Sequence, residues 1–315
     1  MTGAVTGAVP GRVASGALAS GPAASGPAAS GPAASGPVWR GWLLVVLGVA
    51  LAAATMAGSA YVGPMIPVAT PLLAGMIFYL IVFIPLILCA VVFGWLEGIP
   101  PWGSGDRPGR WAAIGIAMGV GGFTVALGYS HLSGTLVSGE GTGAAVGIVI
   151  AAVALVLFQS ASEEVFFRGW LLQSLMTKIG VPGAVLLSAA VFAAFHILGG
   201  ARGPLTLVNL VLGGIWFGLL AARSGGIVAP LAAHAAWNVI EDPILGLTPN
   251  PGVATFGSMI DLDLVGASLW GGSAEGMNTS ISMTIVLAAM IIPLAWTSSV
   301  RTPGAPVPRR SGLAA

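Results

Sequence analysis

Charged residues are scarce in this chain, and their scarcity excludes most classes of soluble protein. Of its 315 residues only 11 are lysine or arginine and 10 are aspartate or glutamate, whereas 56% are hydrophobic. The mean hydropathy of +0.97 lies far outside the range of a soluble globular domain. The sequence therefore predicts a polytopic membrane protein. A net charge of +1 provides no basic field to hold a nucleic acid, so we expect no nucleic-acid partner.

Cysteine is almost absent as well. The single cysteine, Cys89, lies inside an apolar run. One cysteine excludes a disulfide framework and a thiolate metal site built from this chain alone. We interpret Cys89 as a small buried hydrophobic residue.

The first 38 residues contain few large apolar side chains. ASGPA-type units repeat over residues 14–37, and such Gly, Pro, Ser and Ala runs cannot form a packed core. We predict a disordered tail at residues 1–38. The first apolar run begins only after Arg40, which does not match the arrangement of a secretory signal. The composition of the tail favours a bacterial source, and hence the bacterial cell membrane.

The remaining sequence contains long apolar segments. A helix needs about 20 mostly apolar residues to cross a bilayer. Eight segments qualify or nearly qualify: 41–61, 72–96, 111–130, 144–163, 181–198, 205–222, 226–240 and 281–300. The sequence therefore predicts an all-α fold, a polytopic membrane helix bundle of about eight transmembrane helices. The last-but-one segment is short and has a polar end, so neighbouring helices should shelter it from lipid.

The basic residues indicate an orientation. With eight spans and a cytoplasmic N-terminus, every lysine and arginine except Arg202 falls on the cytoplasmic side. Residues 241–280 carry several acidic residues and no lysine or arginine, which agrees with an outer loop. We expect an integral membrane protein, surrounded by the lipid bilayer, with both termini in the cytoplasm.

A cluster of charges stands out in the stretch ASEEVFFRGW, residues 161–170, between apolar runs. An isolated ion in hydrocarbon is strongly disfavoured, so these groups need partners or water. Glu164 and Arg168 are four residues apart and can pair on one helical face, whereas Glu163 points about 100° away and stays available.

Two later segments carry further polar residues. FAAFH places Phe192 and His196 on one helical face, and HAAWN does the same for His234 and Asn238. A glutamate, two histidines and an amide can perform hydrolysis, because a carboxylate takes a proton from water and an amide binds an oxyanion. Glutamate and histidine are also ordinary zinc ligands, and the residues alone do not separate the two options.

The motifs EEVFFR, FAAFH and HAAWN resemble, in order and spacing across residues 163–238, the EExxxR, FxxxH and HxxxN motifs of the CPBP intramembrane protease family. This family includes the Ras-converting CAAX prenyl endopeptidases. The resemblance implies that Glu163 activates the attacking water and that Glu164 and Arg168 support the motif helix. It also implies that His196 and His234 line the site.

The resemblance further implies that Asn238 stabilises the oxyanion. If Asn238 binds the oxyanion, only one glutamate and two histidines remain as possible zinc ligands. We therefore prefer a reaction that requires no cofactor. Zinc, held by Glu163, His196 and His234, is the alternative. The expected substrate is a peptide or membrane protein, with a prenylated CAAX protein among the options. An ion- or proton-coupled transporter and an inactive scaffold or immunity protein of the same family are the alternative functions.

These inferences divide the chain into five parts. The tail, residues 1–38, precedes N-terminal transmembrane helices at 39–143. The protease core with the three motifs follows at 144–240. An outer acidic loop at 241–280 leads to the last transmembrane helix and cytoplasmic tail at 281–315.

Overall fold

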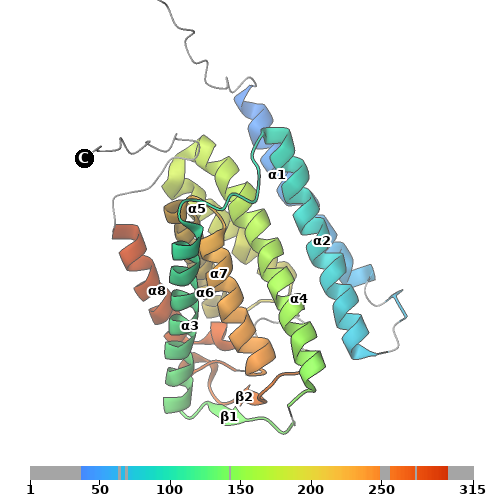
Figure 1. Cartoon of the computed structure of the whole chain (residues 1–315), viewed down its shortest axis with the longest axis vertical. Coiled ribbons are helices and arrows are strands. Elements are labelled where there is room, and N and C mark those ends of the chain that lie inside the picture. The colour runs from blue at the N-terminus through green and yellow to red at the C-terminus, as the bar shows by residue number, and fades with distance from the viewer. Residues whose placement is uncertain are drawn as a thin grey trace, which may run out of the picture. The chain divides into compact units, whose positions relative to one another are not determined.

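The computed structural model describes residues 37–62, 65–67, 70–141, 143–248, 256–273 and 275–296. Within these residues the chain is an all-α helix bundle, which confirms the predicted fold class (Figure 1). Residues 1–36 of the predicted disordered tail lie outside the described part, whereas Val38 already begins a helix.

The helices follow one another up and down the bundle (Figure 1). The α-helices are α1 (Val38–Val62), α2 (Pro71–Glu97), α3 (Pro108–Leu132), α4 (Val146–Glu164), α5 (Leu172–Leu198), α6 (Pro204–Ser224), α7 (Val228–Val239) and α8 (Ile281–Trp296). Two π-helical segments, η2 (Val165–Leu171) and η3 (Ile240–Ile244), directly follow α4 and α7. Prolines at the first or second position of α2, α3 and α6 suit these starts, because the missing N–H would have no helical partner there.

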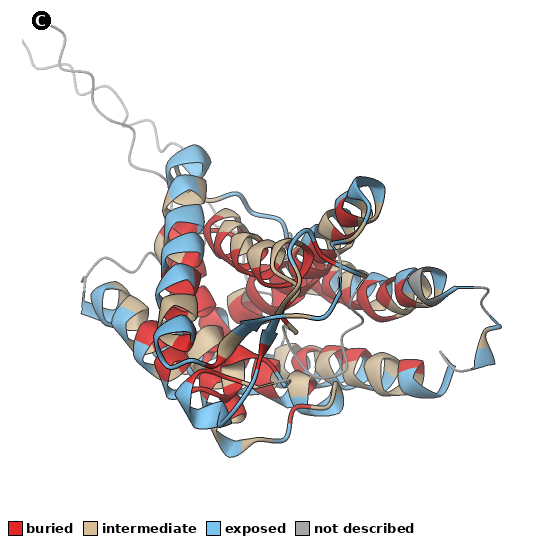
Figure 2. Ribbon diagram, turned by 90° about the horizontal axis from the view of Figure 1, so that it is seen from below, coloured by how far each residue is buried: buried red, intermediate tan, exposed pale blue. Residues whose placement is uncertain are grey.

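Several helices are built to lie in a membrane. Five segments of the described residues are long and apolar enough to cross one: Val38–Val62, Leu73–Glu97, Pro108–Leu132, Val146–Leu198 and Pro204–Ser224. Figure 2 shows buried residues on the inward faces of the helices and exposed residues on the outward faces. The exposed faces carry large apolar side chains such as Leu47, Leu88 and Ile150. The chain is therefore an integral membrane protein whose outward surface faces lipid.

The largest departure from the predicted spans concerns residues 164–179. The expected spans at 144–163 and 181–198 leave these residues as a connection between helices, but α4 continues through η2 into the first part of α5. The chain folds back only at Gly180, whose φ of 70° and ψ of 173° are non-helical, and Pro182 starts the returning helix. The predicted end at 163 was wrong because the charges of 163–168 interrupt the apolar pattern without interrupting the helix.

Small residues allow the returning part of α5 to pack closely on α6. A Cβ on Gly214 would lie 2.8 Å from the Cα of Ala189, so any larger residue would separate the two helices. Similarly, Gly115 and Gly119 of α3 lie against the backbone of Ala229 and Ala233 in α7. These contacts shelter the short helix α7, as its length predicts.

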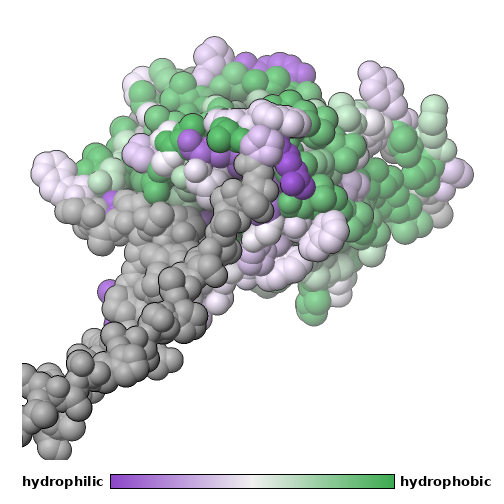
Figure 3. Space-filling view, turned by 90° about the horizontal axis from the view of Figure 1, so that it is seen from above, coloured by the Kyte–Doolittle hydropathy of each residue, from purple (hydrophilic) through white to green (hydrophobic). Residues whose placement is uncertain are grey.

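The two ends of the bundle differ in charge. The end that holds the start of α1, the end of α2 and the Gly180 turn carries Arg40, Arg107, Arg110, Lys178 and Arg223. Exposed Trp39, Trp95, Trp102 and Trp296 lie at the same end, as expected for an interfacial aromatic belt. Figure 3 looks onto this end and shows hydrophilic residues bordered by hydrophobic ones.

The opposite end is covered by a small sheet that the sequence did not predict. Strand β1 (Leu136–Ser138) pairs antiparallel with β2 (Leu262–Leu264), with Val137 opposite Asp263 (Figure 1). Asp261 accepts a hydrogen bond from the backbone N–H of Gly141 at 2.6 Å. Part of the segment 241–280 is therefore folded against the bundle.

Candidate active site

The two glutamates of the first motif lie deep inside the bundle. Glu163 is 6% exposed and Glu164 is fully buried, at the point where α4 becomes η2. Glu163 precedes the Gly180 turn by about 26 Å of helix and His196 follows the turn by about 24 Å, at 1.5 Å per residue. The antiparallel hairpin therefore brings both residues to the same depth.

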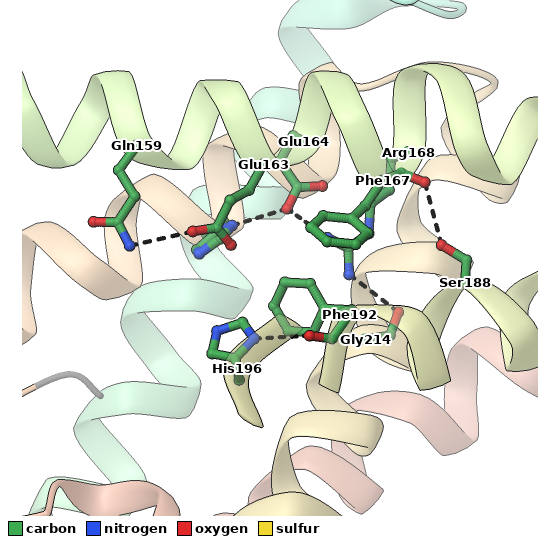
Figure 4. A network of polar contacts seen from close by, with 10 residues as sticks. Gln159, Glu163, Glu164, Phe167, Arg168, Ser188, Phe192, His196 and Gly214 are labelled. Atoms are coloured by element: carbon green, nitrogen blue, oxygen red, sulfur yellow. Dashed lines mark hydrogen bonds and ion pairs between the residues drawn. The ribbon is translucent and has the colours of Figure 1, made fainter. Parts of the chain in front are cut away.

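Glu164 joins two of the motifs. Its Oε1 accepts hydrogen bonds from Nη1 of Arg168 at 2.9 Å and faces Nδ1 of His234 at 2.8 Å. The ion pair with Arg168 is the one that the four-residue spacing predicts. Nη2 of Arg168 also donates to the carbonyl oxygen of Gly214 at 3.3 Å, which ties η2 to α6 (Figure 4).

Aromatic rings surround the buried guanidinium of Arg168. Its Cζ lies 4.6 Å from the ring centre of Phe192 and 5.1 Å from that of Phe217. Each of these rings also contacts a histidine: the centres of Phe192 and His196 are 4.4 Å apart, and Phe217 stacks on His234 at 4.8 Å. Arg168 thus supports both imidazole rings through the two phenylalanines.

The hydrogen bonds of His196 define which of its nitrogens is free. Nδ1 lies 2.9 Å from the carbonyl oxygen of Phe192, and a carbonyl only accepts, so Nδ1 is the donor (Figure 4). In the neutral ring Nε2 is then left as an acceptor. The charges of Glu163 and His234 both act on the His196 ring.

Glu163 keeps one oxygen uncommitted. Nε2 of Gln159, one turn earlier on α4, donates to Oε1 of Glu163 at 3.2 Å. Oε2 is buried and has no hydrogen-bond partner. A buried carboxylate with one fixed and one free oxygen is arranged to accept a proton from a bound water.

A pocket of about 480 Å³ of empty space, including its open part, adjoins these residues. His196, His234 and Asn238 line it together with Trp216, Phe217, Trp237 and Glu241, among others. Glu163 is not among the lining residues. The predicted histidines and amide therefore line one cavity.

The alternative prediction is a zinc ion held by Glu163, His196 and His234. In the described part of the chain, no three His, Cys, Asp or Glu side chains are grouped so that they could hold one metal ion. Nδ1 of His234 faces Glu164, and Nδ1 of His196 donates to a backbone carbonyl. In both rings Nε2 is therefore free, an arrangement that catalytic and metal-ligating histidines share.

Both π-helical segments begin directly after motif residues. η2 starts at Val165, after the two glutamates, and η3 starts at Ile240, two residues after Asn238. Pro243 explains the second, because it lacks an N–H and its ring disfavours α-helical geometry in the preceding turn. Such insertions occur frequently at functional sites.

Sequence reasoning missed three residues of this site. Gln159 and Phe217 are ordinary in a membrane helix and give no signal before their contacts are known. Glu241 did give a sequence signal, because it follows Asn238 by three residues and His234 by seven. This spacing places the three residues on the same face of a helix. The prediction placed it in the outer loop because the span was ended at residue 240, whereas η3 continues the helix by one turn.

Comparison with known proteins bears on the same segment. Residues 145–240 match the family model described as type II CAAX prenyl endopeptidase Rce1-like. No curated protein and no solved structure matches the chain. The matched residues run from the start of α4 to the start of η3 and contain all three motifs.

Proposed function

We propose that the chain is an intramembrane endopeptidase, because residues 145–240 match the model of the Rce1-like type II CAAX prenyl endopeptidases. The single observation that supports this proposal is that His196 and His234 line one pocket from separate helices, while the buried Glu163, on a third helix, acts electrostatically on His196. The substrate is a peptide or membrane protein whose scissile bond enters that pocket. A prenylated CAAX-type substrate is one candidate for this role.

Glu163 acts as the general base in this proposal. Its free Oε2 takes a proton from a water molecule whose oxygen attacks the scissile carbonyl carbon. Gln159 holds Oε1 and so fixes the direction of the carboxylate. The same proton then passes to the leaving nitrogen as the C–N bond breaks, which returns Glu163 to its starting state.

The other motif residues position the reactants. Nε2 of His196 accepts a hydrogen bond from the attacking water, since its Nδ1 is held by the backbone. The amide of Asn238 donates to the oxyanion of the tetrahedral intermediate. Glu164 and Arg168 hold His234 and the helices in place and take no part in proton transfer. No step of this proposal passes through a metal ion, because a carboxylate base and an amide donor are sufficient for hydrolysis.

The test compares the new protein N-termini formed in membranes that contain wild-type protein or the Glu163→Gln variant. Loss of the base should reduce cleavage by about 10²–10⁴-fold while the protein stays folded, because glutamine keeps the shape and the hydrogen bond from Gln159. Glu140→Gln, the same change on an exposed loop, is the matched control and should cleave like wild type. Equal cleavage by the Glu163→Gln protein would refute the proposal.

A further inference from the structure

Glu241 is a buried carboxylate in the pocket that the proposed hydrolysis does not use. It lies in η3, is 2% exposed, and lines the pocket together with His196 and Asn238. Its Oε1 has no hydrogen-bond partner in the described part of the chain. Trp237, one turn earlier, hydrogen-bonds to the Glu241 side chain, so one part of the carboxyl is fixed while Oε1 is free for a ligand.

Another polar side chain of the pocket is already committed. Nδ2 of Asn209 donates to the carbonyl oxygens of Asn278 and Ser280 at 2.9 Å each, and its Oδ1 accepts from Thr284 at 2.7 Å. Asn209 therefore holds the start of α8 against α6. Glu241 has no comparable function in the fold, and a buried oxygen without a partner is unfavourable unless a ligand uses it.

The surroundings favour a cation as that ligand. Residues 241–280 contain no lysine or arginine, so this segment offers no positive charge to Glu241. Asp242, the next residue, is also 2% exposed and has an oxygen without a hydrogen-bond partner, so it supplies no positive charge either. Arg202, at the same end of the bundle, donates to the backbone carbonyls of Ile197 and Ala201.

The aromatic residues of the pocket wall also favour the binding of a cation. Trp216, Phe217 and Trp237 line it and form an aromatic cluster, in which Trp216 stacks on Phe217 at 4.6 Å. Aromatic faces attract ammonium and guanidinium groups, and the attraction increases when the cation is removed from water. A carboxylate beside aromatic faces therefore distinguishes a basic side chain from an apolar one of equal length.

We propose that Glu241 is a specificity-determining residue, whose carboxylate binds a lysine or arginine side chain of the peptide substrate next to the scissile bond. This inference rests on the proposed endopeptidase function for its role in catalysis. The binding of the cation itself requires only the pocket. Substrates of this chain should accordingly carry a basic residue at one fixed position relative to the bond that is cleaved.

The test uses the full chain in lipid nanodiscs and a synthetic library of apolar twelve-residue peptides. Each peptide contains lysine, norleucine or glutamate at one varied position, and mass spectrometry reports which peptides are cleaved. Wild type should cleave lysine peptides about 30-fold or more faster than their norleucine counterparts at one position, as expected for a buried charge pair. In the Glu241→Gln variant this ratio should fall close to one.

Two further measurements distinguish a failure of the Glu241 proposal from a failure of the endopeptidase proposal. Glu275→Gln changes an exposed glutamate of the same 241–280 segment and should keep the lysine preference. Capture of library peptides on immobilised nanodiscs reports binding without cleavage. Selective capture of lysine peptides without any cleavage would support the cation site and refute the protease. Cleavage without a lysine preference in wild type, or a preference that persists in Glu241→Gln, would overturn the inference about Glu241.

Discussion

Replacing Arg168 should destabilise this bundle more than replacing any exposed arginine. Its guanidinium is fully buried, pairs with Glu164 at 2.9 Å and donates to the carbonyl oxygen of Gly214 at 3.3 Å. Arg168→Met removes the cation and leaves the carboxylate of Glu164 in an apolar interior. Removing one partner of a buried ion pair typically costs about 3–5 kcal/mol of unfolding free energy.

The aromatic contacts modify this value only slightly. Each cation–π contact contributes about 0.5–2 kcal/mol, but methionine recovers part of that through its own contacts with the rings of Phe192 and Phe217. We therefore expect Arg168→Met to lower the unfolding free energy by about 4–5 kcal/mol. The measurement is equilibrium unfolding of purified protein in mixed detergent and SDS micelles.

A double-mutant cycle separates the stranded charge from the loss of packing. Glu164→Gln alone leaves a buried cation, whereas the double variant Glu164→Gln/Arg168→Met leaves no charge. The double variant should therefore lose at least about 2 kcal/mol less than the sum of the single variants. Arg202→Met, an exposed arginine, is the control and should change stability by less than about 1 kcal/mol. Additive losses, or a loss below about 1 kcal/mol for Arg168→Met, would show that the buried ion pair does not stabilise the bundle.

Three more predictions concern the site and its surroundings. Phe217→Leu should leave the protein folded but lower kcat about 10-fold more than it changes KM, because the ring that stacks on His234 is lost; an unchanged kcat would remove Phe217 from the positioning of that histidine. Gly169→Ala should reduce folded yield, because its Cβ would collide with the carbonyl oxygen of Pro101, while Gly109→Ala has open space and serves as the control; equal yields would show that η2 can shift. Dialysis against EDTA or phenanthroline should leave most peptidase activity, and activity that is lost and then restored by Zn²⁺ would contradict the metal-free mechanism.

Much of the fold follows from apolar periodicity, but the interior of the long helix does not. Hydropathy correctly indicates helices near 41–61, 72–96 and 111–130, which the structure extends by one to three residues at each end. Hydropathy does not predict the helix at 164–179, because charged residues lower the hydropathy of a segment and so suggest a loop. In the structure Glu164 and Arg168 form an ion pair inside the protein, and the helix continues. The pairing that preserves the helix is a tertiary effect and becomes evident only from the packed bundle.

The motif residues could be singled out from the sequence, whereas most of the residues that contact them could not. Glu163, His196 and His234 each interrupt an otherwise apolar helix, where polar groups are rarely present without a function, and the resemblance to the CPBP motifs implies that they share a site. Nothing in the sequence specifies that Phe217 stacks on His234, since phenylalanine is equally suited to packing anywhere in the bundle. Glu241 could have been found by extending the helical face of His234 beyond residue 240.

The distribution of hydrogen bonds explains why these charges are compatible with a stable bundle. Glu164, the deepest carboxylate, has both Arg168 and His234 as partners, so the charge at the centre of the site is compensated. Oε2 of Glu163 and Oε1 of Glu241, two of the four buried carboxylate oxygens without a partner in the described residues, belong to the residues to which we assign water activation and substrate recognition; the other two are Oε2 of Glu164 and Oδ2 of Asp242. A buried oxygen without a partner lowers stability, and a fold retains it where binding or catalysis requires a free acceptor. The same reasoning connects both proposals, because each assigns a ligand to an oxygen that the protein itself leaves unsatisfied.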